Sequence, residues 1–250
     1  MDILADSFLI AHRGASLDAP ENTLASVRLA WEQNADAVEC DIRLSRDGRI
    51  MIVHDQSASR TTGFDWNIAQ YTSDELRKLD AGKWKSPVFA GERIPFLEEV
   101  LETVPPGRKL FIEIKCGIEI LPVLKTVLPA DSSSFCALIG FEGEIMAEAK
   151  RRFPDHKTCL LCEFPHRLPL NGAKNDGAAL IELVKRLDLD GMDVRTRGLT
   201  QGHVQRVRDA GLDMYVWTVN KVSEAERFLS WGVQGITTDC PGLLRPPERA

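Results

Sequence analysis

Several features that would assign a protein to a familiar functional class are scarce or missing in this 250-residue sequence. Basic residues are outnumbered by acidic ones, and the net charge of −6 argues against a broad nucleic-acid-binding surface. No apolar run is long enough to cross a bilayer, and residues 1–6 do not resemble a signal peptide. We therefore expect a cytoplasmic protein with no nucleic-acid partner and without stable membrane insertion.

Common phosphate-binding and zinc-binding motifs are also absent. The sequence contains no P-loop and no G-x-G-x-x-G after its first apolar run. Of six cysteines, only Cys159 and Cys162 form a C-x-x-C, and in the predicted strand around them the two thiols face opposite sides. No second pair completes a zinc site. We expect the cysteines to be buried structural residues.

The sequence does contain a regular alternation of predicted strands and helices. Strands are expected at residues 8–12, 37–44, 109–115, 135–141, 158–162, 191–194, 213–219 and 235–238. Most of the segments between them have the apolar periodicity of helices. Such alternation is typical of parallel β-α-β units, and about 250 residues suit a single (β/α)₈ TIM barrel. A doubly wound open sheet is the alternative, disfavoured by the missing glycine-rich loop.

We expect residues 1–250 to form one barrel domain that carries a small insertion. Residues 50–53 are interpreted as a hairpin extension of the second barrel strand, after the turn at Asp47 and Gly48. Residues 56–93 are polar, with little sustained periodicity, and are predicted to form a small insertion or lid between barrel strands 2 and 3. Asn22 is predicted to be the N-cap of the first helix.

Ionisable residues stand within or at the end of the first apolar runs. His12 and His54 each follow one such run, and Glu39 and Asp41 occupy alternate positions of another. Alternate residues of a strand face the same side, so the two carboxylates point the same way. Two histidines and such a carboxylate pair suit a metal-assisted acid–base site.

A third predicted strand carries another pair of charges. Glu113 and Lys115 share one face of the apolar segment 110–115, which is costly unless something compensates them. A buried structural ion pair is the alternative explanation. Together with Glu39 and Asp41, Glu113 would supply three hard oxygen ligands, which suit Mg²⁺ or Ca²⁺ better than zinc.

At this point the sequence resembles the glycerophosphodiester phosphodiesterases, in their bacterial, cytoplasmic type. The motifs that carry the resemblance are HRG at 12–14, PENT at 20–23, VECDI at 38–42, VHD at 53–55, IEIK at 112–115, VWTVN at 216–220 and GITTD at 235–239. They follow the order of the family from about residue 8 to residue 241. The resemblance implies a TIM barrel with a small insertion and metal-dependent hydrolysis of glycerophosphodiesters to sn-glycerol 3-phosphate and an alcohol.

Site roles also follow from the resemblance. By resemblance, the metal ligands are Glu39, Asp41 and Glu113, the acid–base pair is His12 and His54, and the residues near the phosphate are Arg13 and Lys115. The cofactor is then one divalent cation, Mg²⁺ or Ca²⁺, and the partner is a small-molecule glycerophosphodiester. The order of proton transfer, the nucleophile (water or the glycerol 2-hydroxyl), the alcohol, the native metal and the formation of a homodimer stay open.

Other polar residues have two interpretations each. Trp217 suits the lining of a glycerol pocket or barrel packing, and Asp55 suits an orienting partner of His54 or a turn. Asn220 and Asp239 suit caps as well as ligand contacts. We expect solvated surface positions for the histidines at 156 and 203, whereas His166 lies in a loop that could overhang the site.

Two other functions stay open at this stage. One is a related phosphodiesterase of different specificity, such as a lysophospholipase D type enzyme. The other is a non-catalytic barrel that binds phosphorylated metabolites. Pure binding needs no paired histidines, which disfavours the second of these.

Overall fold

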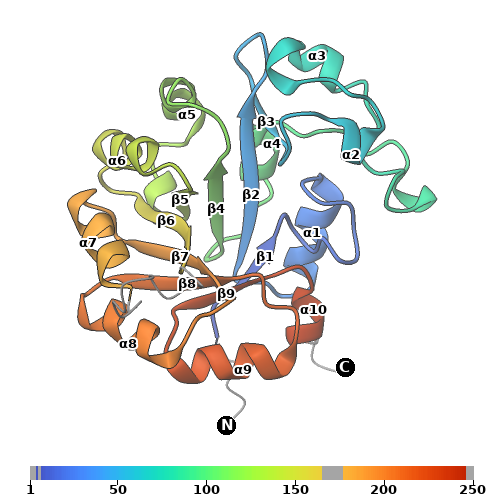
Figure 1. Cartoon of the computed structure of the whole chain (residues 1–250). Helices are drawn as coiled ribbons and strands as arrows, with labels where there is room; N and C mark the ends of the chain where they lie inside the picture. Colours follow the sequence, from blue (N-terminus) through green and yellow to red (C-terminus); the bar gives the residue numbers. More distant parts are fainter. Residues whose placement is uncertain (1–3, 5–6, 165–176, 246–250) are drawn as a thin grey trace.

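A computed structural model of the chain describes residues 4, 7–164 and 177–245. Within this part, nine strands form one sheet in the order β1-β9-β8-β7-β6-β5-β4-β2-β3, and β1 also pairs with β2. That extra pairing closes eight parallel strands into a barrel, with helices around the outside (Figure 1). The predicted (β/α)₈ TIM barrel is therefore confirmed.

The elements have the following bounds. The barrel strands are β1 (Leu9–His12), β2 (Ala37–Leu44), β4 (Lys109–Ile114), β5 (Cys136–Gly140), β6 (Lys157–Glu163), β7 (Gly191–Arg195), β8 (Asp213–Trp217) and β9 (Gly235–Thr238). The outer helices are α1 (Leu24–Glu32), α4 (Leu97–Leu101), α5 (Ile120–Val127), α6 (Gly143–Arg152), α7 (Ala178–Arg186), α8 (Gln201–Asp209), α9 (Val222–Trp231) and α10 (Pro241–Leu244). The ends of the barrel strands lie within a few residues of the predicted ones.

The segment between β2 and β4 departs from the barrel. Strand β3 (Ile50–Ile52) pairs antiparallel with β2, as the predicted hairpin requires. The elements that follow are α2 (Ser59–Thr62), η1 (Ile68–Gln70), α3 (Ser73–Leu76) and η2 (Pro87–Phe89). Ile68, Leu76 and Leu79 belong to an apolar cluster separate from the main core. This segment packs against one side of the barrel (Figure 1).

The start of α1 corrects one expectation. Its N-cap is Thr23, whose Oγ1 accepts a hydrogen bond from the backbone N–H of Ser26, and the prediction of Asn22 as the cap is wrong. Asn22 has a φ of 56°, and its side-chain amide donates to Asp41 Oδ2 at 2.7 Å. The side-chain amide of Asn22 therefore binds a buried carboxylate, and the next residue caps the helix instead.

Two more expectations about histidines are wrong. His156 and His203 are buried, not solvated. The Nε2 atom of His156 lies 2.9 Å from the hydroxyl of Ser132, and the ring of His203 stacks on Phe164 with centroids 4.4 Å apart. A polar side chain can be buried when a partner satisfies it. His166 lies outside the described residues.

The cysteine prediction agrees with the structure. Cys159 belongs to the apolar cluster inside the barrel, whereas Cys162 belongs to the cluster between the sheet and the helices. The six cysteines are free, and all except Cys116 are buried. In the described part of the chain, no helix combines the length and apolar character that a bilayer-spanning segment needs.

The strand register arranges the inward-facing side chains in levels. In a barrel with a shear of about eight, a level advances by about one residue per strand and draws four side chains from alternate strands. One level then consists of Ile10, Phe111, Cys159 and Tyr215. Toward the C-terminal ends of the strands, the next level consists of Glu39, Ile139, Asp193 and Thr237, followed by His12, Glu113, Leu161 and Trp217. Polarity therefore enters the barrel interior at its C-terminal half.

Candidate active site

A cavity of about 120 Å³ lies at the C-terminal ends of the barrel strands. Its lining includes every predicted site residue except Asp41: His12, Arg13, Glu39, His54, Glu113, Lys115 and Trp217. Asp41 is fully buried beside them. The C-terminal end of the strands is where TIM-barrel enzymes have their active sites.

Three carboxylates converge at this cavity. Glu39 and Asp41 come from β2, and Glu113 pairs with Asp41 in the register of β2 with β4. One carboxylate oxygen from each lies within 4.8 Å of the other two. The Oε1 atom of Glu39 has no hydrogen-bond partner, whereas its Oε2 accepts the backbone N–H of Arg13 at 2.9 Å. A buried, unpaired oxygen in an all-carboxylate cluster fits a hard divalent cation.

Two cationic side chains contact the same cluster. Lys115 Nζ lies 2.5 Å from Glu113 Oε1 and 3.3 Å from Asp41 Oδ1. Arg13 Nε lies 3.2 Å from Asp41 Oδ2, and its Nη1 lies 2.8 Å from Glu21 Oε1. The Glu113–Lys115 ion pair considered from the sequence is therefore present, but as part of a larger charged cluster.

Burial and mutual repulsion separate the acidities of the three carboxyls. Burial, followed by repulsion from its carboxylate neighbours, raises the pKa of Glu39 well above its ordinary value. Burial and then Asp41 raise the pKa of Glu113 to about 7. Burial opposes ionisation of Asp41 as well, but Arg13 and Lys115 lower its pKa to about 2. Glu39 and Glu113 therefore ionise reluctantly without added positive charge, and a bound cation would favour their ionised forms.

Both predicted catalytic histidines have a carboxylate partner. His12 Nδ1 lies 2.7 Å from Asp239 Oδ1, and His54 Nδ1 lies 2.8 Å from Asp55 Oδ1. An ionised carboxylate only accepts hydrogen bonds, so each Nδ1 carries the proton and each Nε2 is free to exchange one. Burial lowers the pKa of the His54 imidazole below its ordinary value. The two rings are alike in having Nδ1 held by a carboxylate.

The partner of His12 is itself held in place. Asp239 follows β9 and accepts hydrogen bonds from Ser16 and Asn220 at 3.1 and 2.7 Å. Burial opposes its ionisation, but His12 and these donors lower the pKa of Asp239 to about 2. The sequence left Asn220 and Asp239 open between caps and ligand contacts. Their position directly after predicted strands was the signal that they lie at the site.

The other side of the cavity is mainly apolar. Phe141 and Trp217 are in edge-to-face contact, with ring centroids 5.8 Å apart. The indole N–H of Trp217 donates to the backbone carbonyl of Asp193 at 3.2 Å. Trp217 lines the cavity, and its contact with a glycerol group stays a prediction. Asp193 and Thr237 also line it and were not identified from the sequence, although Asp193, like Glu39, is a carboxylate inside an apolar strand.

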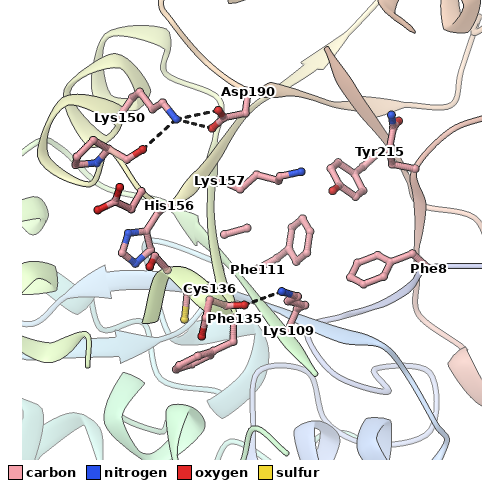
Figure 2. Close-up of a pocket in the computed structure, with 16 residues that line it drawn as sticks. Phe8, Lys109, Phe111, Phe135, Cys136, Lys150, His156, Lys157, Asp190 and Tyr215 are labelled. Atoms are coloured by element: carbon pink, nitrogen blue, oxygen red, sulfur yellow. Dashed lines mark hydrogen bonds and ion pairs between the residues drawn. The ribbon is translucent and has the colours of Figure 1, made fainter. Parts of the chain in front are cut away.

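A larger cavity, of about 570 Å³, lies at the N-terminal ends of the strands (Figure 2). Phe8, Phe111 and Tyr215 line it, and the rings of Phe111 and Tyr215 are 5.2 Å apart. Lys150 there forms an ion pair with Asp190 at 2.8 Å. None of the predicted site residues lines this larger cavity.

The chain is similar in sequence to known phosphodiesterases. Residues 12–122 and 163–243 match the model of the glycerophosphoryl diester phosphodiesterase family. The chain is 31% identical over 249 residues to a glycerophosphodiester phosphodiesterase of Caldanaerobacter subterraneus, covering 95% of this chain and 96% of the relative. It is 32% identical over 259 residues to a glycerophosphodiester phosphodiesterase of Bacillus subtilis, covering 96% and 86%.

A solved structure extends the similarity to three dimensions. It is that of an Oleispira antarctica phosphodiesterase in complex with the product sn-glycerol-3-phosphate. The TM-score is 0.83 at 31% identity, and the match covers 94% of each chain. The family match includes all three clustered carboxylates and both histidines. This chain therefore belongs to the glycerophosphoryl diester phosphodiesterase family.

Proposed function

We propose that this protein hydrolyses glycerophosphodiesters to sn-glycerol 3-phosphate and an alcohol, with one divalent cation. The observation that carries the proposal is the pairing of a three-carboxylate cluster with two aspartate-held histidines around one small cavity. The Oleispira antarctica phosphodiesterase, which binds sn-glycerol-3-phosphate as its product, supports the same substrate class.

Glu39, Asp41 and Glu113 would hold the cation, Mg²⁺ or Ca²⁺. Their oxygens are the ligand type that both ions prefer, and Glu39 Oε1 has no competing partner. When bound, the cation supplies positive charge that stabilises the charge developing on the phosphoryl oxygens.

Arg13 and Lys115 are proposed to bind the phosphate. Both line the cavity, and both already contact carboxylates there. A guanidinium and an ammonium beside the phosphoryl group neutralise the negative charge that repels a nucleophile. Arg13 is fixed from two sides, because Glu21 and Asp41 hold its side chain and Glu39 accepts its backbone N–H.

His12 and His54 are proposed to move the protons. One imidazole Nε2 accepts a proton from the attacking oxygen, and the other, in its protonated form, donates one to the leaving alkoxide. The P–O bond to the alcohol breaks as the bond to the nucleophile forms. The proposal leaves open which histidine acts first and whether the nucleophile is water or the glycerol 2-hydroxyl.

Some predictions made from the sequence extend this proposal. We propose that residues 56–93 act as a lid on a single barrel domain. Arg60 of α2 lies 2.6 Å from Asp55 Oδ2 and 2.5 Å from Glu21 Oε2. These two carboxylates are the partners of His54 and Arg13. A cytoplasmic location and a homodimer stay predictions.

The test is release of choline and sn-glycerol 3-phosphate from glycerophosphocholine with Mg²⁺ or Ca²⁺ present. We expect excess EDTA or Glu39→Gln to reduce turnover by about 10³-fold or more. The matched control is Asp190→Asn at the opposite end of the barrel, which should leave turnover unchanged. Undiminished turnover in EDTA or in Glu39→Gln would contradict the proposal. Faster turnover of a lysophospholipid would favour the lysophospholipase D type activity instead.

A further inference from the structure

One buried carboxyl at the cavity has no part in the mechanism proposed above. Asp193, on β7, is 2% exposed, lines the cavity, and has no hydrogen-bond partner at Oδ1. Leaving a buried carboxyl oxygen unpaired is costly in a protein interior. An unpaired oxygen that faces a ligand cavity indicates that the ligand supplies the partner.

A second unpaired group lies at the same level of the barrel. Thr237, on β9, is also 2% exposed and lines the cavity, and its Oγ1 has no hydrogen-bond partner. The register places both side chains in the level that also contains Glu39 and Ile139. In that level Asp193 stands across the barrel from Glu39. The floor of the cavity therefore has a cation-binding side and a second polar side.

The chemistry of the second side suits hydroxyl groups. Arg13 and Lys115 are on the side of the carboxylate cluster, so the phosphate belongs there. With the phosphate held there, the glycerol group of the substrate would extend across the floor. Its free hydroxyls both donate and accept hydrogen bonds. A carboxyl and a threonine hydroxyl match such groups.

The charge state of Asp193 agrees with this assignment. Burial, followed by repulsion from Glu113, raises its pKa to about 8. At neutral pH the carboxyl is mostly uncharged, so it adds little repulsion against a nearby phosphate. An uncharged carboxyl donates one hydrogen bond and accepts others.

We propose that Asp193 and Thr237 form a subsite that binds the free hydroxyls of the substrate's glycerol group. The inference rests on the proposed function and deepens it, because it names the groups that distinguish a glycerol ester from a simple alkyl ester. A site built to hydrogen-bond a hydroxyl rejects analogues that lack it, since its own polar groups are then left unpaired.

Equilibrium binding tests this subsite independently of turnover. Isothermal titration calorimetry with Mg²⁺ present would compare sn-glycerol 3-phosphate with n-propyl phosphate, which lacks both hydroxyls. We expect the wild-type protein to prefer sn-glycerol 3-phosphate by about 10- to 100-fold. Asp193→Ala should reduce this preference to about threefold or less, with n-propyl phosphate bound as before. Thr237→Val, nearly isosteric, should remove part of the preference and keeps the test valid should Asp193→Ala fail to fold.

The control is Thr158→Val, a buried threonine of β6 whose hydroxyl bonds Asp190 away from the cavity. It should keep the wild-type preference. An absent preference in the wild type, an unchanged one in both cavity variants, or an equal weakening of both ligands would overturn the subsite. A protein that shows the preference but releases no sn-glycerol 3-phosphate from glycerophosphocholine would overturn the proposed function and leave the subsite intact.

Discussion

The cavity at the C-terminal end of the barrel measures about 120 Å³, and the one at the N-terminal end about 570 Å³. In the larger cavity Lys150 forms an ion pair with Asp190 (Figure 2). Lys157, which also lines this cavity, forms an ion pair with Asp213. In the smaller one, Glu39 keeps an unpaired buried oxygen. An unpaired buried oxygen, and not volume, distinguishes the candidate active site from the larger cavity.

The two ends also differ in what fills the barrel axis. Toward the N-terminal end, the aromatic rings of Phe8, Phe111 and Tyr215 contact one another. Toward the C-terminal end, the successive levels carry Glu39 and Asp193, then His12 and Glu113. Burial of the aromatic rings stabilises the barrel. This stabilisation offsets the cost of burying charged side chains in the two C-terminal levels.

A matched pair of histidine variants gives the largest expected difference between the two ends. His12→Gln should reduce kcat for glycerophosphocholine by about 10²- to 10⁴-fold, the usual contribution of a general acid or base. His156→Gln should leave kcat unchanged, because His156 lines the N-terminal cavity and bonds Ser132 there. Steady-state kinetics on both purified variants would check this. Equal losses in the two variants would contradict the assignment of the reaction to the C-terminal end.

A pair of aspartate variants refines the comparison. Asp239→Asn should reduce kcat by about 10- to 100-fold, since the amide no longer holds the Nδ1 proton of His12 in the productive orientation. Asp213→Asn, which removes the partner of Lys157 at the other end, should affect stability and not kcat. The pH profile of kcat would separate the two cases: a shifted profile in Asp239→Asn supports its action through His12, and an unchanged profile and rate refute it.

The smallest effect concerns stability at low pH. Burial opposes ionisation of Asp190, but hydrogen bonds from Lys150 and Thr158 lower its pKa below the ordinary value. A lowered folded-state pKa means a contribution to stability that is present above the unfolded pKa of about 4 and is lost as the pH falls through the folded value. Asp190→Asn should therefore destabilise the protein by about 1–2 kcal/mol at pH 7, and by progressively less as the pH falls below about 4.

Urea unfolding at several pH values would measure that difference. Activity in Asp190→Asn should be unchanged at pH 7, where the folded population stays high. A destabilisation that is the same at pH 3 and pH 7 would show that Asp190 acts through packing and not through its charge.

Much of the architecture could be predicted because local patterns and the final fold agree. The apolar runs gave the barrel strands to within a few residues, and strand alternation correctly separated Cys159 from Cys162. Wrong expectations arose where a distant partner decides the environment. The side chain of Asn22 is hydrogen-bonded to Asp41, and the ring of His203 stacks on Phe164. Neither partner is near in sequence.

The residues of the candidate site likewise divide into those that the sequence could identify and those that it could not. Glu39, Asp41 and Glu113 stand out in the sequence because a charge inside an apolar strand is costly wherever that strand is buried. The lack of hydrogen-bond partners at Asp193 Oδ1 and Thr237 Oγ1 could not be predicted from the sequence. It depends on which strands are neighbours and on their register.

Neighbouring residues determine three features of this protein, which can therefore be predicted from the sequence alone. These are the alternation of strands and helices, its eight-fold repetition and the spacing of ionisable residues along each strand. Closure of the barrel is not local. The pairing of β1 with β9 brings Asp239 to His12 across 227 positions, and the shear of the closed sheet sets which side chains share a level. The contact between Asp239 and His12 and the composition of each level both depend on packing of the complete barrel, because no shorter segment buries its strands on both faces.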